Sequence, residues 1–260
     1  MSVNIVDFPV VKRPGATLIA PAIEPSMASL LAVEYVSEAL GLKEVGFMRM
    51  KGLQAPIYAI DGVLRAPCRL LYNSNYPLIA FRTAIKIPEE LEEEIASQLI
   101  EWAERNEVER LVILSTIEGE GEDVYVATES WLLEKYLKYG FRPIEKTVIK
   151  DFSAALLSEC LLRRIDGVII YAETPIYSVL KRISSKLQSG EISEARANEL
   201  ISGLKPDVKA SLKLVEAVRR ITGLEFDLSE LKELAEKFSG VYSQILMELA
   251  STERRLVIFK

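Results

Sequence analysis

Residues 91–117, LEEEIASQLIEWAERNEVERLVILSTI, decide the class of fold, because a helical pattern is followed directly by the pattern of a buried strand. The apolar residues of the first part recur at steps of four, four and three, as in an amphipathic helix: Leu91, Ile95, Leu99 and Trp102. Residues 111–114 are continuously apolar, as in a parallel strand that is covered on both faces. The stretch therefore predicts a helix that packs on a sheet.

The same alternation extends over residues 1–175. Short apolar runs between turn residues predict strands at 17–20, 44–50, 69–73, 78–83, 111–114, 124–127, 147–149 and 166–175. Helical periodicity predicts helices at 26–41, with Ser26 as N-cap, and at 88–106, 130–139 and 152–164. The pair Asp61-Gly62 lies between two apolar runs and predicts a type I′ hairpin. We therefore expect a layered α/β fold with a mostly parallel sheet and an antiparallel insert.

After Pro175 the chain is predicted to be helical throughout. Four helices are expected, at 176–187, 193–201, 206–222 and from 228 to about 250. The predicted organisation is an α/β core domain at 1–175, a helical C-terminal region at 176–250 that packs on the core, and a tail at 251–260.

Composition limits the class of protein. The chain has 260 residues, of which 49% are hydrophobic and 27% charged, as expected of a globular protein. The net charge of −6 argues against a nucleic-acid partner, which favours a basic face. The sequence has neither the pattern of a signal peptide nor a stretch long enough to span a membrane, so a cytoplasmic protein is expected.

The sequence contains no histidine, and this restricts the possible chemistry. It excludes Ser-His-Asp and Cys-His nucleophile systems and histidine-based zinc sites. The two cysteines, Cys68 and Cys160, are too far apart in sequence for a metal-type pair and are expected to be idle thiols. No catalytic residue, cofactor or metal site is predicted, although carboxylate, lysine and Mg²⁺ chemistry are not excluded.

Two polar segments are the remaining candidates for a site. The acidic loop, EGEGED at 118–123, follows a predicted buried strand and could hold a hard cation through Glu118, Glu120, Glu122 and Asp123. A solvated loop is the favoured interpretation, because the loop matches neither a dinucleotide motif nor an EF-hand. Lys150-Asp151 follows another predicted strand, and here a surface ion pair is favoured over a site.

Three stretches resemble the proteasome assembly chaperone 2 family, in its archaeal branch: VIKDFSAALLSECLLRRIDGVIIYAETP at 148–175, PDVKASLKLVEAVRRITG at 206–223 and LEFDLSELKELAEKF at 224–238. Residues 99–117 also match the helix and central strand of that family, and the similarity covers roughly residues 15–250. The chain departs from the family pattern in three places. EPSMASL at 24–30 replaces a Gly-rich helix start, Val208 follows Asp207 in place of proline, and the helical insert after Pro175 is longer.

The resemblance implies a nucleoside-phosphorylase-like α/β fold without known catalysis. It also implies self-association, expected here as a trimer to pentamer, and binding to proteasome α-subunits. The alternative is a phosphorylase-like or ligase-like α/β enzyme that uses the acidic loop and Mg²⁺.

The last seven residues, RRLVIFK, allow two interpretations. The chain ends in Ile258, Phe259 and Lys260, which is similar to the hydrophobic-Tyr-any ending of archaeal proteasome activators, with Phe in place of Tyr. The resemblance therefore implies that these residues bind between α-subunits. The other interpretation is a final strand paired with the sheet of the protein itself.

Overall fold

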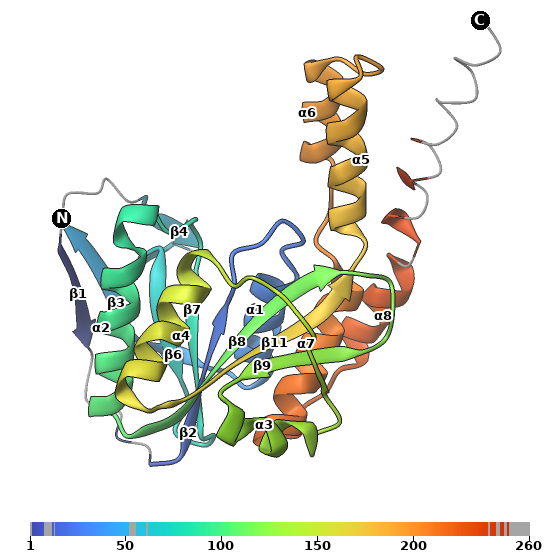
Figure 1. Ribbon diagram of the computed structural model, residues 1–260. Helices are drawn as coiled ribbons and strands as arrows, with labels where there is room; N and C mark the ends of the chain where they lie inside the picture. Colours follow the sequence, from blue (N-terminus) through green and yellow to red (C-terminus); the bar gives the residue numbers. More distant parts are fainter. Residues whose placement is uncertain are drawn as a thin grey trace, which may run out of the picture.

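The computed structural model describes residues 2–7, 12, 14–51, 56–60, 62–238, 240–242, 245–246 and 249. The strands are β1 (Ser2–Asp7), β2 (Ala16–Pro21), β3 (Lys43–Lys51), β4 (Tyr58–Ile60), β5 (Val63–Arg65), β6 (Cys68–Tyr72), β7 (Leu78–Thr83), β8 (Val108–Glu118), β9 (Val124–Thr128), β10 (Arg142–Pro143) and β11 (Asp166–Thr174). One sheet has the order β1-β3-β6-β7-β2-β8-β11-β9-β10, and β4 and β5 form a separate hairpin. Helices lie on both faces of the sheet (Figure 1), so the predicted α/β class is confirmed.

Parallel strands form the centre of this mixed sheet. β7, β2, β8 and β11 are parallel to one another, and every residue of β2 is buried, as its unbroken apolar sequence predicts. The predicted antiparallel insert is confirmed, because β6 pairs antiparallel with both β3 and β7, and β1 continues the same pattern on β3. On the other side β9 is antiparallel to β11. The finer expectation of a nucleoside-phosphorylase-like layering stays a prediction.

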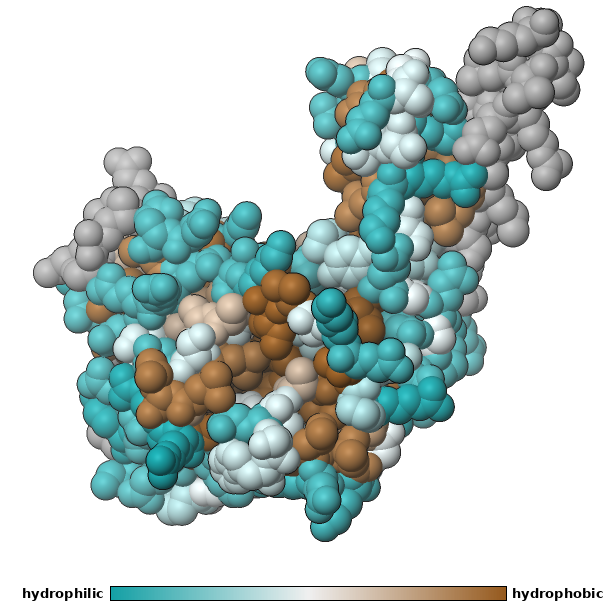
Figure 2. Space-filling view, in the orientation of Figure 1, coloured by the Kyte–Doolittle hydropathy of each residue, from teal (hydrophilic) through white to brown (hydrophobic). Residues whose placement is uncertain are grey.

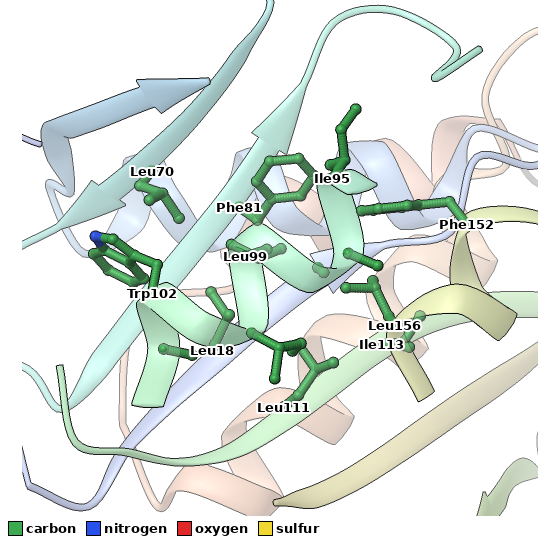
Figure 3. Close-up of a cluster of buried hydrophobic side chains, with 14 of the residues drawn as sticks. Leu18, Leu70, Phe81, Ile95, Leu99, Trp102, Leu111, Ile113, Phe152 and Leu156 are labelled. Atoms are coloured by element: carbon green, nitrogen blue, oxygen red, sulfur yellow. The ribbon is translucent and has the colours of Figure 1, made fainter. Parts of the chain in front are cut away.

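The helices divide between the two faces. They are α1 (Ala28–Ala39), the 3-10 helix η1 (Glu89–Leu91), α2 (Glu92–Arg105), α3 (Ser130–Leu137), α4 (Asp151–Arg163), α5 (Ile176–Gln188), α6 (Glu194–Ser202), α7 (Val208–Thr222) and α8 (Ser229–Lys237). α2 and α4 pack on one face, where Leu99, Phe81 and Phe152 meet in a fully apolar cluster (Figure 3). α1, α3, α7 and α8 supply the apolar cluster on the opposite face.

The helices α5 and α6 form an arm that projects from the body of the molecule (Figure 1). The arm has a small apolar cluster of its own, in which Ile183 of α5 and Ala197 of α6 contact Tyr242 and Leu249 from the C-terminal part of the chain. The arm and the C-terminal residues thus bury apolar side chains that the main sheet does not cover. The division into domains at residue 175 stays a prediction.

The strand predicted at 147–149 is wrong. Residues 147–150 have no regular secondary structure, and the strand that pairs with β9 is instead the short β10. Val148 is 73% exposed, so this apolar segment lies on the surface although its composition is that of a strand. Local β-propensity is not sufficient here, because a strand needs a neighbouring strand to pair with and these residues pair with none of the described strands.

Two helix boundaries also differ from the prediction. The helix expected from 228 to about 250 ends at Lys237, and Gly240 has a φ of 83°, which interrupts the helical path. The described residues after this turn are helical again. At α1, Met27 and not Ser26 occupies the N-cap position. Among the described residues, the helices are all too short or too polar to cross a membrane.

Candidate functional site

The acidic loop distributes its carboxylates among basic side chains and does not gather them around one point. Glu118 accepts a hydrogen bond from the hydroxyl of Ser178 at 2.9 Å and pairs with Lys181, both on α5. Asp123 pairs with Arg142 of β10 at 2.6 Å. The hydrogen bonds from Lys181 and then Ser178 lower the pKa of Glu118 below its ordinary value. These carboxylates therefore link the loop to two neighbouring elements.

The middle of the acidic loop is held by α7. Glu122 pairs with Lys209 at 2.5 Å and lies 3.5 Å from the ammonium group of Lys213. Lys213 is only 8% exposed, and its ammonium group also donates a hydrogen bond to the carbonyl of Gly121. The hydrogen bond from Lys209 is the main cause that lowers the pKa of Glu122. The loop is thus attached to α7 by one buried and one exposed lysine.

The glycines of the acidic loop have a packing role. A Cβ at Gly119 or Gly121 would collide with the side chain of Glu173, which passes close to both. Among the described residues, no group of three or more His, Cys, Asp or Glu side chains could hold a metal ion. The Mg²⁺ site of the enzyme alternative therefore has no support in the loop that was expected to provide it.

The two cysteines are buried free thiols. Burial raises the pKa of the Cys160 thiol to about 12, and it also raises the pKa of the Cys68 thiol. Such thiols are almost entirely protonated at neutral pH and are poor nucleophiles. The structure confirms that both thiols are buried, as is expected of idle thiols.

The loop between β2 and α1 closes on one carboxylate. The side chain of Glu24 accepts hydrogen bonds from the backbone N–H and the hydroxyl of Ser26 and from those of Ser29, at 2.5 to 3.0 Å. This geometry turns the chain so tightly that Met27 has a φ of 55°, in the left-handed region that favours glycine. Met27 therefore stands where the family pattern has a Gly-rich helix start, and Glu24 supplies the hydrogen bonds that hold the turn.

Asp207 joins α7 to the carboxyl end of the sheet. Its carboxylate accepts the hydroxyl of Thr174 at 2.6 Å and the backbone N–H of Ala210 at 3.0 Å. Its own N–H donates to the carbonyl of Ser26 at 2.9 Å. These bonds satisfy the N-terminus of α7 and connect it to both β11 and the β2–α1 loop.

A cavity of 490 Å³ lies at the carboxyl ends of the central parallel strands, beneath the N-terminus of α4. This is the end of an open α/β sheet at which ligands generally bind. Lys150 and Asp151 both line this cavity and make no ion pair with each other, so the predicted surface pair is wrong. The sequence signal for the cavity is weak: Ser115 and Thr116 are polar residues at the end of an otherwise apolar strand.

An apolar groove of 340 Å³ lies between α4 and the strands β9 and β11. Leu157, Leu161 and Ile149 line it, and Leu161 is 54% exposed. Figure 2 shows apolar side chains gathered in a hollow on this face of the molecule. The hairpin of β4 and β5 is a second apolar surface, since Leu64 is 73% exposed. Exposed apolar surface of this kind is typical of sites that contact other proteins.

The residues expected to bind a partner, Ile258, Phe259 and Lys260, lie outside the described residues. Neither the docking interpretation nor the paired-strand interpretation of the tail is tested by the structure.

Comparison with known proteins identifies the family of the chain. The model of the PAC2 family matches residues 18–246. The chain belongs to the PAC2 family. The match includes the central sheet, the arm and α7, so membership rests on nearly the whole described fold.

Solved structures show the same fold. PbaA of Pyrococcus furiosus, an archaeal homolog of proteasome-assembly chaperone, is 17% identical with a TM-score of 0.71, and the match covers 95% of this chain and 99% of that chain. PbaB of Pyrococcus furiosus, an archaeal proteasome activator, is also 17% identical with a TM-score of 0.71, over 94% of this chain and 98% of that chain. A Thermoplasma acidophilum protein of unknown function is 20% identical with a TM-score of 0.67, over 94% and 90%. A search of curated proteins found no match.

Proposed function

We propose that this protein is a chaperone-like partner of the proteasome core particle and acts by binding, without catalysis, in the cytoplasm. The observation that carries the proposal is membership of the PAC2 family over residues 18–246, together with full-length similarity of fold to PbaA and PbaB. The pairing of the acidic loop with lysines supports the same view, because it removes the one segment that suggested metal-dependent chemistry.

The partner-binding residues that we propose are Ile258, Phe259 and Lys260, which would bind proteasome α-subunits. Leu249 is 4% exposed and belongs to the apolar cluster of the arm, so the chain is held at this residue. The eleven residues that follow could span about 36 Å if extended, which is enough to reach a neighbouring protein. Phe259 would fill an apolar pocket, and the terminal carboxylate would meet a cationic group.

The experiment is a binding titration of the full chain against purified proteasome α-rings. We expect deletion of residues 258–260 to abolish binding without lowering the melting temperature. Phe259→Ala should weaken binding about 30-fold, the effect of losing roughly 2 kcal/mol at a buried aromatic anchor. Phe259→Tyr is the matched control and should bind at least as well as the natural sequence. A truncated protein that melts several degrees lower and still binds α-rings would show that the tail is structural.

We further propose that the protein is a closed homo-oligomer of three to five copies. The apolar groove and the β4–β5 hairpin support this proposal, because both expose large aliphatic side chains that a monomer gains nothing by exposing. Identical subunits that associate through such surfaces favour rotational symmetry.

A further inference from the structure

The cavity at the carboxyl ends of the strands contains hydroxyl groups that the protein does not use. Ser115 of β8 and Tyr171 of β11 are neighbours across the parallel pair, so their side chains point to the same face of the sheet. Ser153 faces them from the first turn of α4. These side chains are 7%, 5% and 8% exposed, and all three line the cavity.

None of these three hydroxyls has a hydrogen-bond partner within the described part of the chain. The neighbouring hydroxyls of Thr116 and Tyr177, by contrast, lie 3.2 Å apart and bond to each other. The oxygen atoms of Ser115, Ser153 and Tyr171 are not among the fully enclosed polar atoms of the described chain, so they open onto the cavity, where a ligand or water can complete their hydrogen bonds. The cavity therefore presents three hydroxyl groups that are free to bond to a polar molecule.

An acidic groove of 630 Å³ adjoins the cavity, and the two share Glu92 and Asp151. Its other charged lining residues are Glu89, Glu90, Glu93 and Glu159. Together the cavity and the groove are lined by seven carboxylates and two lysines, Lys86 and Lys150. A space lined predominantly by one sign of charge raises the local concentration of the opposite ion.

The carboxylates at the junction of the cavity and the groove repel one another. Burial, followed by the carboxylates of Asp151 and Glu89, raises the pKa of Glu92 above its ordinary value. Lys86 and the backbone N–H of Phe152 compensate this only in part. Acidic residues at the N-termini of α2 and α4 are favoured by the helix dipoles, which explains why the cluster is tolerated. The dipoles do not account for the three hydroxyls beside it.

We propose that the cavity and the acidic groove together bind a linear primary amine. One ammonium group would lie between Glu92 and Asp151. A further N–H group of the ligand, either a second amine of a polyamine or a backbone amide of a peptide, would donate hydrogen bonds to the hydroxyls of Ser115, Ser153 and Tyr171. The aromatic ring of Tyr171 adds favourable contact with a cation. The ligand group that the site would recognise is an alkylammonium chain. Two sources supply this group: a free polyamine and the lysine side chain of a peptide.

The test is calorimetric titration of the full-length protein at low salt with two probes, spermidine and the peptide acetyl-Gly-Lys-Gly-amide. The same peptide with norleucine in place of lysine is the uncharged probe and should not bind. Glu92→Gln keeps an acceptor for the backbone N–H of Phe152 but removes the charge, and should weaken binding at least tenfold. Tyr171→Phe and Ser115→Ala should each weaken it about tenfold, the usual effect of losing a hydrogen bond to a charged group.

Glu101→Gln is the matched control, because Glu101 is exposed on α2 outside the groove and the substitution removes the same charge. It should change binding less than twofold. Tighter binding of spermidine than of the peptide identifies a free polyamine as the source of the amine, and the reverse identifies a lysine side chain. The proposal is overturned if neither probe binds, if Glu101→Gln weakens binding as much as Glu92→Gln, or if both hydroxyl variants bind as the natural protein does. Melting curves of each variant separate loss of binding from loss of folding.

Discussion

Replacing Lys213 with methionine tests whether the acidic loop is a structural attachment or a metal site. Methionine keeps most of the aliphatic stem but removes the ammonium group that donates to the carbonyl of Gly121 and lies 3.5 Å from Glu122. A hydrogen bond from a charged donor contributes about 1.5–3 kcal/mol, and the value should lie in the lower half of this range because Gly121 is exposed and water can replace the lost donor. The lost attraction to Glu122 adds little, because that side chain is 71% exposed and screened by solvent. We therefore expect a loss of about 2 kcal/mol.

For a chain of this length, the loss corresponds to a melting temperature lowered by about 4–8 °C. Differential scanning calorimetry measures it, and Lys232→Met is the matched control, since Lys232 is exposed on α8. A second measurement uses magnesium. A metal ion that bound only the native state would raise the melting temperature, so about 10 mM MgCl₂ should leave it unchanged if the loop holds no metal. The reasoning is refuted if Lys213→Met melts like the control. It is equally refuted if Mg²⁺ stabilises the protein and Asp123→Asn removes that effect.

Three further predictions concern other parts of the molecule. Leu161→Asp places a charge in the apolar groove and should convert the oligomer to a species near 29.1 kDa by light scattering; an unchanged mass would place the self-association elsewhere. Met27→Gly should raise the free energy of unfolding by about 1 kcal/mol, because glycine adopts the left-handed conformation without the steric cost; a lower stability in urea would show that the Met27 side chain contributes more than its backbone costs. Cys68 and Cys160 should not react with a thiol reagent at pH 8 until the protein is unfolded, when both should react; a thiol labelled in the native state would contradict their burial and raised pKa values.

The sequence predicts those elements whose pattern is repeated over many residues. The helix at 88–106 and the apolar strand at 111–114 were found because periodicity and burial agree there. The failures occur where a non-local contact decides. Residues 147–149 have the composition of a strand but reach no sheet edge, and Gly240 interrupts a helix whose apolar spacing continues through it. Propensity carries no information on which partner a segment meets.

The candidate sites were less accessible to prediction than the fold. The acidic loop was conspicuous in the sequence, but its partners lie on α5 and α7, 60 to 92 residues further along the chain. The row formed by Ser115 and Tyr171 depends on the register between β8 and β11, and a change of one residue would turn Tyr171 to the opposite face. Register depends on the packed sheet as a whole and is not written in either strand alone.

The carboxyl end of the sheet differs between its two faces, and this contrast locates the part of the molecule that is open to a ligand. On the face covered by α7, Asp207 joins three elements: it accepts a hydrogen bond from Thr174, caps α7 and holds the loop that leads into α1, while the hydroxyl of Ser211 on α7 is enclosed without a partner among the described residues. On the face covered by α4, Ser115 and Tyr171 are just as buried and have no such partner in the described chain. These two hydroxyls open onto the cavity and can bond to a ligand there. What distinguishes the α4 face is therefore the cavity itself, and the ligand that we propose would bind on that face.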